Sequence, residues 1–135
     1  MTGAAKGRGR RILLVDDEPD ILDTVKQLLE YRFSDVEVVV APSGMAALKQ
    51  LETAPFNLVI TDFRMPGMDG AELVARVRSQ WPDTPVLMVT AYLEPTTHDE
   101  LARRAPGLDV LPKPLELDSF LATVGRVLGK GPVTA

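Results

Sequence analysis

Short apolar runs alternate along this chain with segments whose apolar residues recur at helical spacing. The first run, Ile12 to Val15, is almost continuously apolar, which is typical of a strand covered on both faces. Further strands are expected at 36–40, 57–61, 85–89 and 109–111. Because parallel strands need crossover helices between them, this alternation predicts an α/β fold with a five-stranded parallel sheet and helices on both faces.

Helical patterns fill the segments between these strands. Pro19 stands near the start of the first helix, where its missing N–H costs nothing, and Ser43 is the expected N-cap of the second helix, which runs to about Thr53. The third helix is expected to end near residues 81–82, and the last runs from about Glu116 to Leu128.

Length and composition limit the chain to one domain. With 135 residues, 45% of them hydrophobic, it can bury a real core, and it contains neither an apolar run of about 18 residues nor a signal peptide. We therefore expect a cytoplasmic protein that does not contact membranes. It consists of a flexible basic N-terminal tip at 1–10, one domain at 11–129 and a flexible C-terminal tail at 130–135.

The charge is unevenly distributed. Four of the 15 basic residues lie within the first eleven positions, so the remainder carries 11 basic against all 19 acidic groups, a net charge of about −8. The basic tip is expected to be solvated and frayed. The acidic body argues against direct nucleic acid binding by this domain, because contacts to phosphates need clustered lysine and arginine.

Polar residues stand where the predicted strands end. The chain has no cysteine and a single histidine, His98, which excludes thiol chemistry, disulfides and multi-histidine metal sites. In open parallel sheets, ligands bind outside the carboxyl ends of the strands. The residues expected to converge at that edge are Asp16, Asp17, Asp62, Thr90 and Lys113.

Three carboxylates at one edge need a neighbouring cation, since two unit charges about 4 Å apart repel by about 4 kcal/mol at an effective dielectric of 20. Oxygen-only donors favour a hard cation, and we expect Mg²⁺ rather than Ca²⁺ because the chain has no calcium-binding loop. A carboxylate held by a metal can attack phosphorus and become an aspartyl phosphate. Thr90 and Lys113 would then supply a hydroxyl and an ammonium to the new group.

Four segments resemble the motifs of one protein family, the receiver domains of two-component response regulators. They are LLVDDEPD at 13–20, ITDFRMPGMDG at 60–70, VTAY at 89–92 and LPKP at 111–114. The resemblance spans about residues 11 to 128. It implies the flavodoxin-like receiver fold, with its strands in the order 2-1-3-4-5.

The resemblance also implies a role for each matching residue. Asp62 is the expected phosphoacceptor, Thr90 the switch hydroxyl and Lys113 the phosphate-binding lysine. The expected ligands of Mg²⁺ are Asp16, Asp17, Asp62 and the backbone carbonyl of Arg64. The peptide bond between Lys113 and Pro114 is expected to be cis.

The resemblance implies a signalling switch that catalyses its own phosphorylation and dephosphorylation, and not an enzyme in the usual sense. The phosphoryl group would come from a sensor histidine kinase, a phosphotransfer protein or a small phosphodonor. The added charge would alter the face built from the fourth helix, the fifth strand and the fifth helix. That face would control a downstream protein or a missing output domain, or form a phosphorylation-dependent homodimer. Arg64 and Tyr92 occupy the positions that tune attack by water in this family.

Two features depart from the family pattern. Val110 stands where the family usually has the tyrosine or phenylalanine that turns inward on phosphorylation, and our hypothesis is that Tyr92 replaces this ring. The segment from Glu94 to Gly107 has few large apolar residues besides Leu101, which predicts a fourth helix that is short or loosely docked.

Two other functions fit parts of the pattern. A phosphohydrolase with an aspartyl nucleophile usually has a second aspartate two residues later, where this chain has Arg64, so this alternative is disfavoured. A receiver-like protein-binding module that is never phosphorylated stays open because of Val110, although Asp62, Thr90 and Lys113 are all present.

Overall fold

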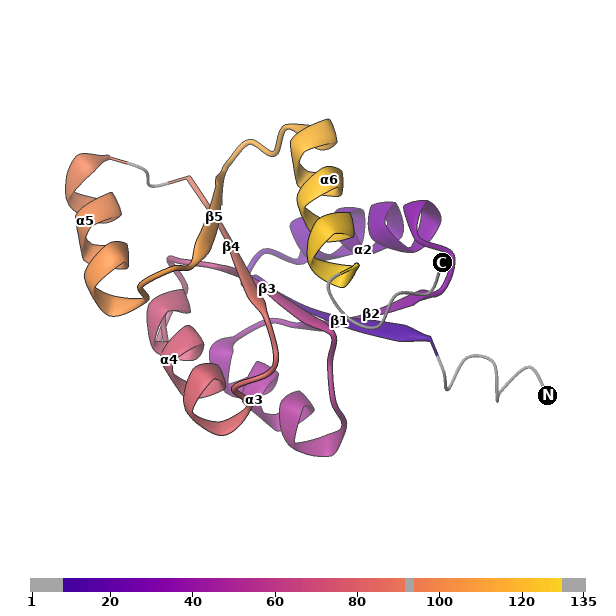
Figure 1. Ribbon diagram of the computed structural model, residues 1–135, viewed down its shortest axis with the longest axis horizontal. Helices are drawn as coiled ribbons and strands as arrows, with labels where there is room; N and C mark the ends of the chain where they lie inside the picture. Colours follow the sequence, from indigo (N-terminus) through magenta and orange to yellow (C-terminus); the bar gives the residue numbers. More distant parts are fainter. Residues whose placement is uncertain (1–8, 92–93, 130–135) are drawn as a thin grey trace.

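The computed structural model describes residues 9–91 and 94–129, which form a five-stranded parallel sheet in the order β2-β1-β3-β4-β5 (Figure 1). This order confirms the expected 2-1-3-4-5 topology. The strands are β1 (Arg10–Val15), β2 (Val36–Ala41), β3 (Leu58–Asp62), β4 (Val86–Thr90) and β5 (Asp109–Pro112). The helices are α2 (Pro19–Arg32), α3 (Gly44–Thr53), α4 (Gly70–Gln80), α5 (Pro95–Arg104) and α6 (Leu117–Leu128).

Helix starts follow the local signals of the sequence. Pro19 opens α2, and the hydroxyl of Ser43 accepts a hydrogen bond from the backbone N–H of Ala46 at the start of α3, as expected for an N-cap. The ends of β3 and β4 lie one residue later than predicted. Asp62 is still paired in register with Val89, so the phosphoacceptor candidate belongs to the strand itself.

The strand β1 begins at Arg10, two residues before the predicted start, so assigning Arg10 to the flexible tip was wrong. Its guanidinium donates to both carboxylate oxygens of Asp35, at 2.7 and 2.9 Å, and its backbone N–H donates to the Asp35 carbonyl. This ion pair joins residues 25 positions apart. The start of β1 is therefore determined by a contact with the residue just before β2.

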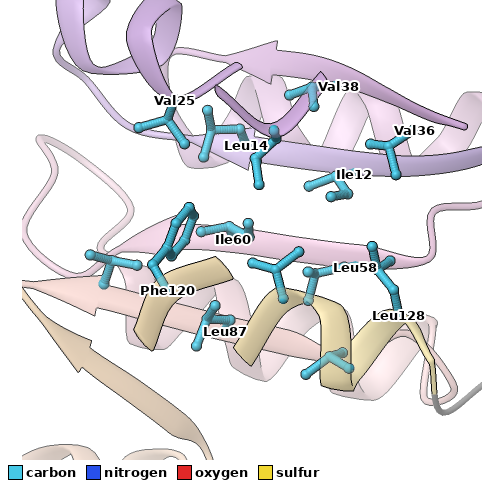
Figure 2. Close-up of a cluster of buried hydrophobic side chains, with 14 of the residues drawn as sticks. Ile12, Leu14, Val25, Val36, Val38, Leu58, Ile60, Leu87, Phe120 and Leu128 are labelled. Atoms are coloured by element: carbon cyan, nitrogen blue, oxygen red, sulfur yellow. The ribbon is translucent and has the colours of Figure 1, made fainter. Parts of the chain in front are cut away.

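Helices cover both faces of the sheet, as predicted. The face that carries α2 and α6 buries one large cluster, in which Phe120 of α6 lies over Ile60 of β3 and Leu87 of β4 (Figure 2). The opposite face carries α3, α4 and α5 (Figure 1). Because β1, β3 and β4 are buried between two layers of helices, their apolar runs are nearly continuous.

The helix α5 has ten residues, as few as α3, and its buried residues are Thr97 and Leu101, so the expected fourth helix is present. Leu101 is 4% exposed and packs in one cluster with Phe63, Met88 and Ala105. Ala105, the C-cap residue that follows α5, is also buried in this cluster.

The outer edge of the sheet at β2 is covered by side chains of α2. Glu30 accepts a hydrogen bond from the backbone N–H of Val38 at 2.9 Å, and Lys26 donates to the carbonyl of the same residue at 2.8 Å. Lys26 and Glu30 also pair with each other at 2.8 Å. The backbone N–H of Val36 is bonded to Phe33, so these groups of the edge strand are satisfied within the chain.

Within residues 9–91 and 94–129, no helix is long and apolar enough to cross a membrane.

Candidate functional site

The carboxyl ends of four neighbouring strands bring the polar residues singled out in the sequence to one edge of the sheet. Asp16 and Asp17 follow β1, Asp62 ends β3, Thr90 ends β4 and Lys113 follows β5. Parallel register aligns these ends, because Val15 pairs with Thr61 and Thr90 with Pro112.

Lys113 lies between two carboxylates of this edge. Its ammonium donates to Asp16 at 3.0 Å and to Asp62 at 3.2 Å, which joins residues 97 and 51 positions apart. Burial lowers the pKa of Lys113, but its hydrogen bond with Asp16 and the charges of both carboxylates outweigh burial, and the pKa is raised. Lys113 is therefore a full cation inside the cluster.

The electrostatic environment of Asp62 differs from that of an exposed aspartate. Burial raises its pKa above the ordinary value and the charge of Asp16 adds to this rise, while Lys113 and the N–H of Phe63 oppose it. One oxygen, Oδ1, accepts from the N–H of Phe63 at 2.7 Å, and the other, Oδ2, faces Lys113. The carboxylate is thus fixed in orientation and incompletely neutralised.

The three carboxylates fit a hard divalent cation. Asp16, Asp17 and Asp62 each offer an oxygen within 4.8 Å of the others, and Asp16 is only 3% exposed while Asp17 is exposed. A cavity of about 330 Å³ opens over Asp17 and Asp62. It is lined by Asp17, Glu18, Asp62, Arg64, Ala91 and Lys113. This all-oxygen donor set beside an open cavity suits Mg²⁺, which keeps several waters and binds few protein carboxylates.

The loop after Asp62 is closed against the start of α4 by Gly70. The N–H of Gly70 donates to the carbonyl of Phe63 at 2.7 Å. A Cβ atom at Gly70 would collide with the backbone oxygen of Asp62 and lie 2.9 Å from the Cα of Phe63. Glycine at position 70 therefore lets the helix start directly against the backbone of the phosphoacceptor candidate.

The side chain of Arg64 lines the cavity and contacts Phe63 and Glu100. Its guanidinium carbon lies 4.2 Å from the centroid of the Phe63 ring, and its Nη2 is 3.9 Å from the carboxylate of Glu100 on α5. Glu100 also accepts from Arg104, which in turn donates to Asp69, the N-cap of α4. Sequence reasoning missed Glu100, Arg104 and Asp69, because charged residues on helix surfaces carry no signal of which distant residue they pair with.

The remaining residues singled out in the sequence lie in different surroundings. Thr90 is fully buried, and its carbonyl accepts from the N–H of Lys113 at 3.0 Å. Val110 lies within β5 and packs against the cluster beneath α5, away from the residues that line the cavity. Tyr92 lies outside the described residues, so its proposed role stays a prediction. Glu18, visible in the acidic run but not singled out, lines the cavity. The Lys113–Pro114 bond is cis, as expected.

We expect Asp69→Asn to lower stability by about 0.5–1 kcal/mol near neutral pH, and the loss to shrink in acid. Burial alone would raise the pKa of Asp69, but hydrogen bonds from Arg104 and from the backbone of α4 outweigh it, and the pKa lies below its ordinary value. A carboxyl with a lowered pKa stabilises the fold above its unfolded pKa of about 4, and this contribution is lost as pH falls through the folded pKa.

Urea unfolding of both proteins across a pH series checks this expectation. Asparagine retains the capping capacity of position 69, so the comparison isolates the charge. A difference in unfolding free energy that stays constant from neutral pH to about pH 2 would contradict it. Asp83→Asn, in the exposed turn before β4, is the control for the loss of one negative charge.

Known proteins are similar to this chain in sequence. The family model of the response regulator receiver domain matches residues 12–125. The chain is 37% identical over 123 residues to the response regulator protein FleR of Pseudomonas aeruginosa, covering 90% of this chain and 25% of FleR. It is 34% identical over 129 residues to the transcriptional regulatory protein TrcR of Mycobacterium tuberculosis, covering 92% of this chain and 47% of TrcR.

Solved structures agree with these sequence matches. The signal receiver domain of an HD domain-containing protein from Pseudomonas fluorescens superposes with a TM-score of 0.83 at 28% identity, covering 91% of this chain and 97% of that one. The response regulator TrrA from Thermotoga maritima, solved in complex with Mg²⁺ and BeF, gives 0.76 at 30% identity, covering 87% and 98%. The chain thus spans a quarter to a half of these two sequence relatives and nearly the whole of these two structures. By its matched family model, its topology and its acidic strand ends, this chain belongs to the response regulator receiver domains.

Proposed function

We propose that this receiver domain is a switch that accepts a phosphoryl group on Asp62 from a sensor histidine kinase or a phosphotransfer protein. The observation that carries the proposal is the position of the Asp62 carboxylate, which faces an open cavity with Lys113 on one side and Asp16 and Asp17 close by. We also propose that the protein is cytoplasmic, where a kinase would meet it.

The reaction would be an attack of an Asp62 oxygen on the phosphorus of the donor. A bond forms between that oxygen and phosphorus, the bond from phosphorus to the donor nitrogen or oxygen breaks, and the leaving group keeps the electron pair. The hydrogen bond from Phe63 to Oδ1 leaves the second oxygen, Oδ2, beside Lys113 on the cavity side. Hydrolysis by water returns the carboxylate and releases inorganic phosphate.

The proposed ligands of Mg²⁺ are the carboxylates of Asp16, Asp17 and Asp62 and the backbone carbonyl of Arg64. When bound, the ion would offset the charge that three carboxylates and a phosphoryl group bring together. Lys113 already supplies one positive charge among them, and it can donate to a phosphoryl oxygen from its present place.

The phosphoryl group would act as a switch through its charge of about −1.5 to −2. Thr90 and Lys113 stand at the ends of β4 and β5, so their movement toward it would be passed to the face formed by α5, β5 and α6. Since the chain covers only part of FleR and TrcR, we propose that this face controls an output domain, a separate protein or a second copy of the domain. We propose that this domain itself does not bind nucleic acid directly.

Incubation of the protein with acetyl phosphate and Mg²⁺ tests this function. We expect intact-mass spectrometry to show the addition of one phosphoryl group, and chelation of the metal by EDTA to suppress it. A protein that gains no mass with Mg²⁺ present would contradict the proposal. That result would favour the alternative of a receiver-like binding module that is never phosphorylated, for which the valine at position 110 is the supporting feature.

A further inference from the structure

Two ion pairs connect the loop after the phosphoacceptor to α5. Arg64, two residues after Asp62, reaches Glu100 of α5, and Asp69 near the end of the loop reaches Arg104, one turn further along the same helix. Glu100 and Arg104 also bind each other at 3.0 Å. The four side chains form one continuous chain of alternating charge between the loop and the helix.

The two connections are unequal. Arg104 donates to both oxygens of Asp69 at 3.0 Å, which is the strong bidentate geometry of a guanidinium on a carboxylate. Arg64 and Glu100 are 3.9 Å apart, and the same Glu100 carboxylate already accepts from Arg104. The Arg64–Glu100 pair is therefore the weaker of the two and the one that a stronger anion can replace.

Arg64 also lies where it could bind a phosphoryl group on Asp62. It lines the same cavity as Asp62 and Lys113, and its side chain is 46% exposed, so a turn toward the cavity would give up its contacts with Glu100 and the Phe63 ring. A phosphoryl group on Asp62 would carry about −1.5 to −2, against a single negative charge on Glu100 that is shared with Arg104. Guanidinium groups match phosphoryl oxygens in shape as well as in charge.

We propose that Glu100 is a positioning residue that holds the Arg64 guanidinium toward α5 in the unphosphorylated protein and yields it to the phosphoryl group when Asp62 is modified. This inference rests on the proposed phosphorylation of Asp62. It names a residue of α5 that regulates the reaction through Arg64 and touches neither the phosphoryl group nor the metal.

The exchange would also provide a route from the phosphoacceptor to α5. Once Arg64 turns to the phosphoryl group, α5 keeps only the Asp69–Arg104 connection of the two described here. The route requires no aromatic ring at position 110, where this chain has valine. The proposed exchange thus links Asp62 to α5 by an ion pair, where the family usually uses an aromatic ring that turns inward.

Replacement of Glu100 by Gln tests the proposal. Without the carboxylate, Arg64 loses its ion pair with α5 before phosphorylation. We therefore expect phosphorylation by acetyl phosphate to be about two- to fivefold faster than in the natural sequence, the range that a partly exposed ion pair carries. Glu72→Gln is the matched control, because Glu72 pairs with Arg76 within α4 and is similarly exposed. It is expected to leave the rate unchanged.

A second background separates action through Arg64 from a general effect of charge. In Arg64→Gln protein, Glu100→Gln is expected to have no further effect on the rate, because its target is gone. The side-chain Nε–Hε signal of Arg64 gives a direct signature by NMR. It should shift when beryllofluoride and Mg²⁺ are added to the natural sequence, and Glu100→Gln should move it before the addition.

Each outcome decides the proposal. If the natural sequence is phosphorylated but Glu100→Gln behaves like Glu72→Gln, the role of Glu100 is wrong and the proposed function stands. If Glu100→Gln retains its effect in the Arg64→Gln background, or leaves the Arg64 signal unmoved, Glu100 does not act through Arg64. If the natural sequence is not phosphorylated at all, both proposals are overturned.

Discussion

Replacing Asp62 by Asn is expected to abolish phosphorylation by acetyl phosphate and, in EDTA, to raise the melting temperature by a few degrees. The amide is a poor nucleophile and cannot form the acyl phosphate. Stability rises because the Asp62 carboxyl has a raised pKa, for which burial is the main cause. A group with a raised folded pKa loses its stabilising contribution as pH increases through that pKa, so the ionised carboxylate is costly at neutral pH.

Intact mass and thermal unfolding of the same samples check both parts of this expectation. The gain in stability should diminish as the pH falls through the raised pKa of the folded Asp62 carboxyl, and it should be absent below the ordinary aspartate pKa of about 4. The exposed Asp83→Asn variant controls for net charge and should retain full phosphorylation. A phosphorylated Asp62→Asn protein would mean that another residue accepts the group, and a clear drop in melting temperature would contradict the crowded acidic pocket.

Replacing Lys113 by Ala is expected to lower stability by about 3 kcal/mol in EDTA, with partial recovery in Mg²⁺. The ammonium is the cation that contacts both Asp16 and Asp62, and these carboxylates have little solvent around them. Removing one partner of a buried pair leaves the other charge uncompensated, which costs more than the pair itself contributes. A divalent cation bound to the same carboxylates would restore part of the lost compensation.

Urea unfolding with and without Mg²⁺ measures the effect of Lys113→Ala. The double variant Lys113→Ala with Asp62→Asn should recover part of the stability in EDTA, because one of the two uncompensated carboxylates is then neutral. Lys49→Ala, at an exposed position of α3, is the control and should be nearly neutral. Equal losses in EDTA and in Mg²⁺ would exclude the carboxylates as the metal ligands.

The sheet and the converging polar residues were predictable because both depend on local pattern and on one geometric rule. The apolar runs of β1, β3 and β4 identify buried strands, and parallel strands bring their carboxyl ends to one edge. The strand order and the assignment of Asp62 as phosphoacceptor needed the resemblance of four motifs to a known family.

Features that depend on distant partners were not predictable. Arg10 was assigned to the N-terminal tip because the sequence around it gives no sign of its pair with Asp35, 25 residues away. The burial of Ala105 beside Leu101 was not predictable either, because a small residue after a helix gives no periodic apolar signal. The sequence gives no indication that Glu100 pairs with Arg64, since any exposed helix surface carries such charges.

The covered edge at β2 has a consequence for how copies of this domain can assemble. Lys26 and Glu30 bind the outward N–H and carbonyl of Val38, so that strand has no pair of groups there for an incoming strand. The other edge, β5, has four residues and ends at Pro112, which has no N–H to donate. Addition of a further strand is therefore disfavoured at these two places on the edges of the sheet. A regulated dimer would then be built from side chains on helix faces, whose charges a phosphoryl group can alter.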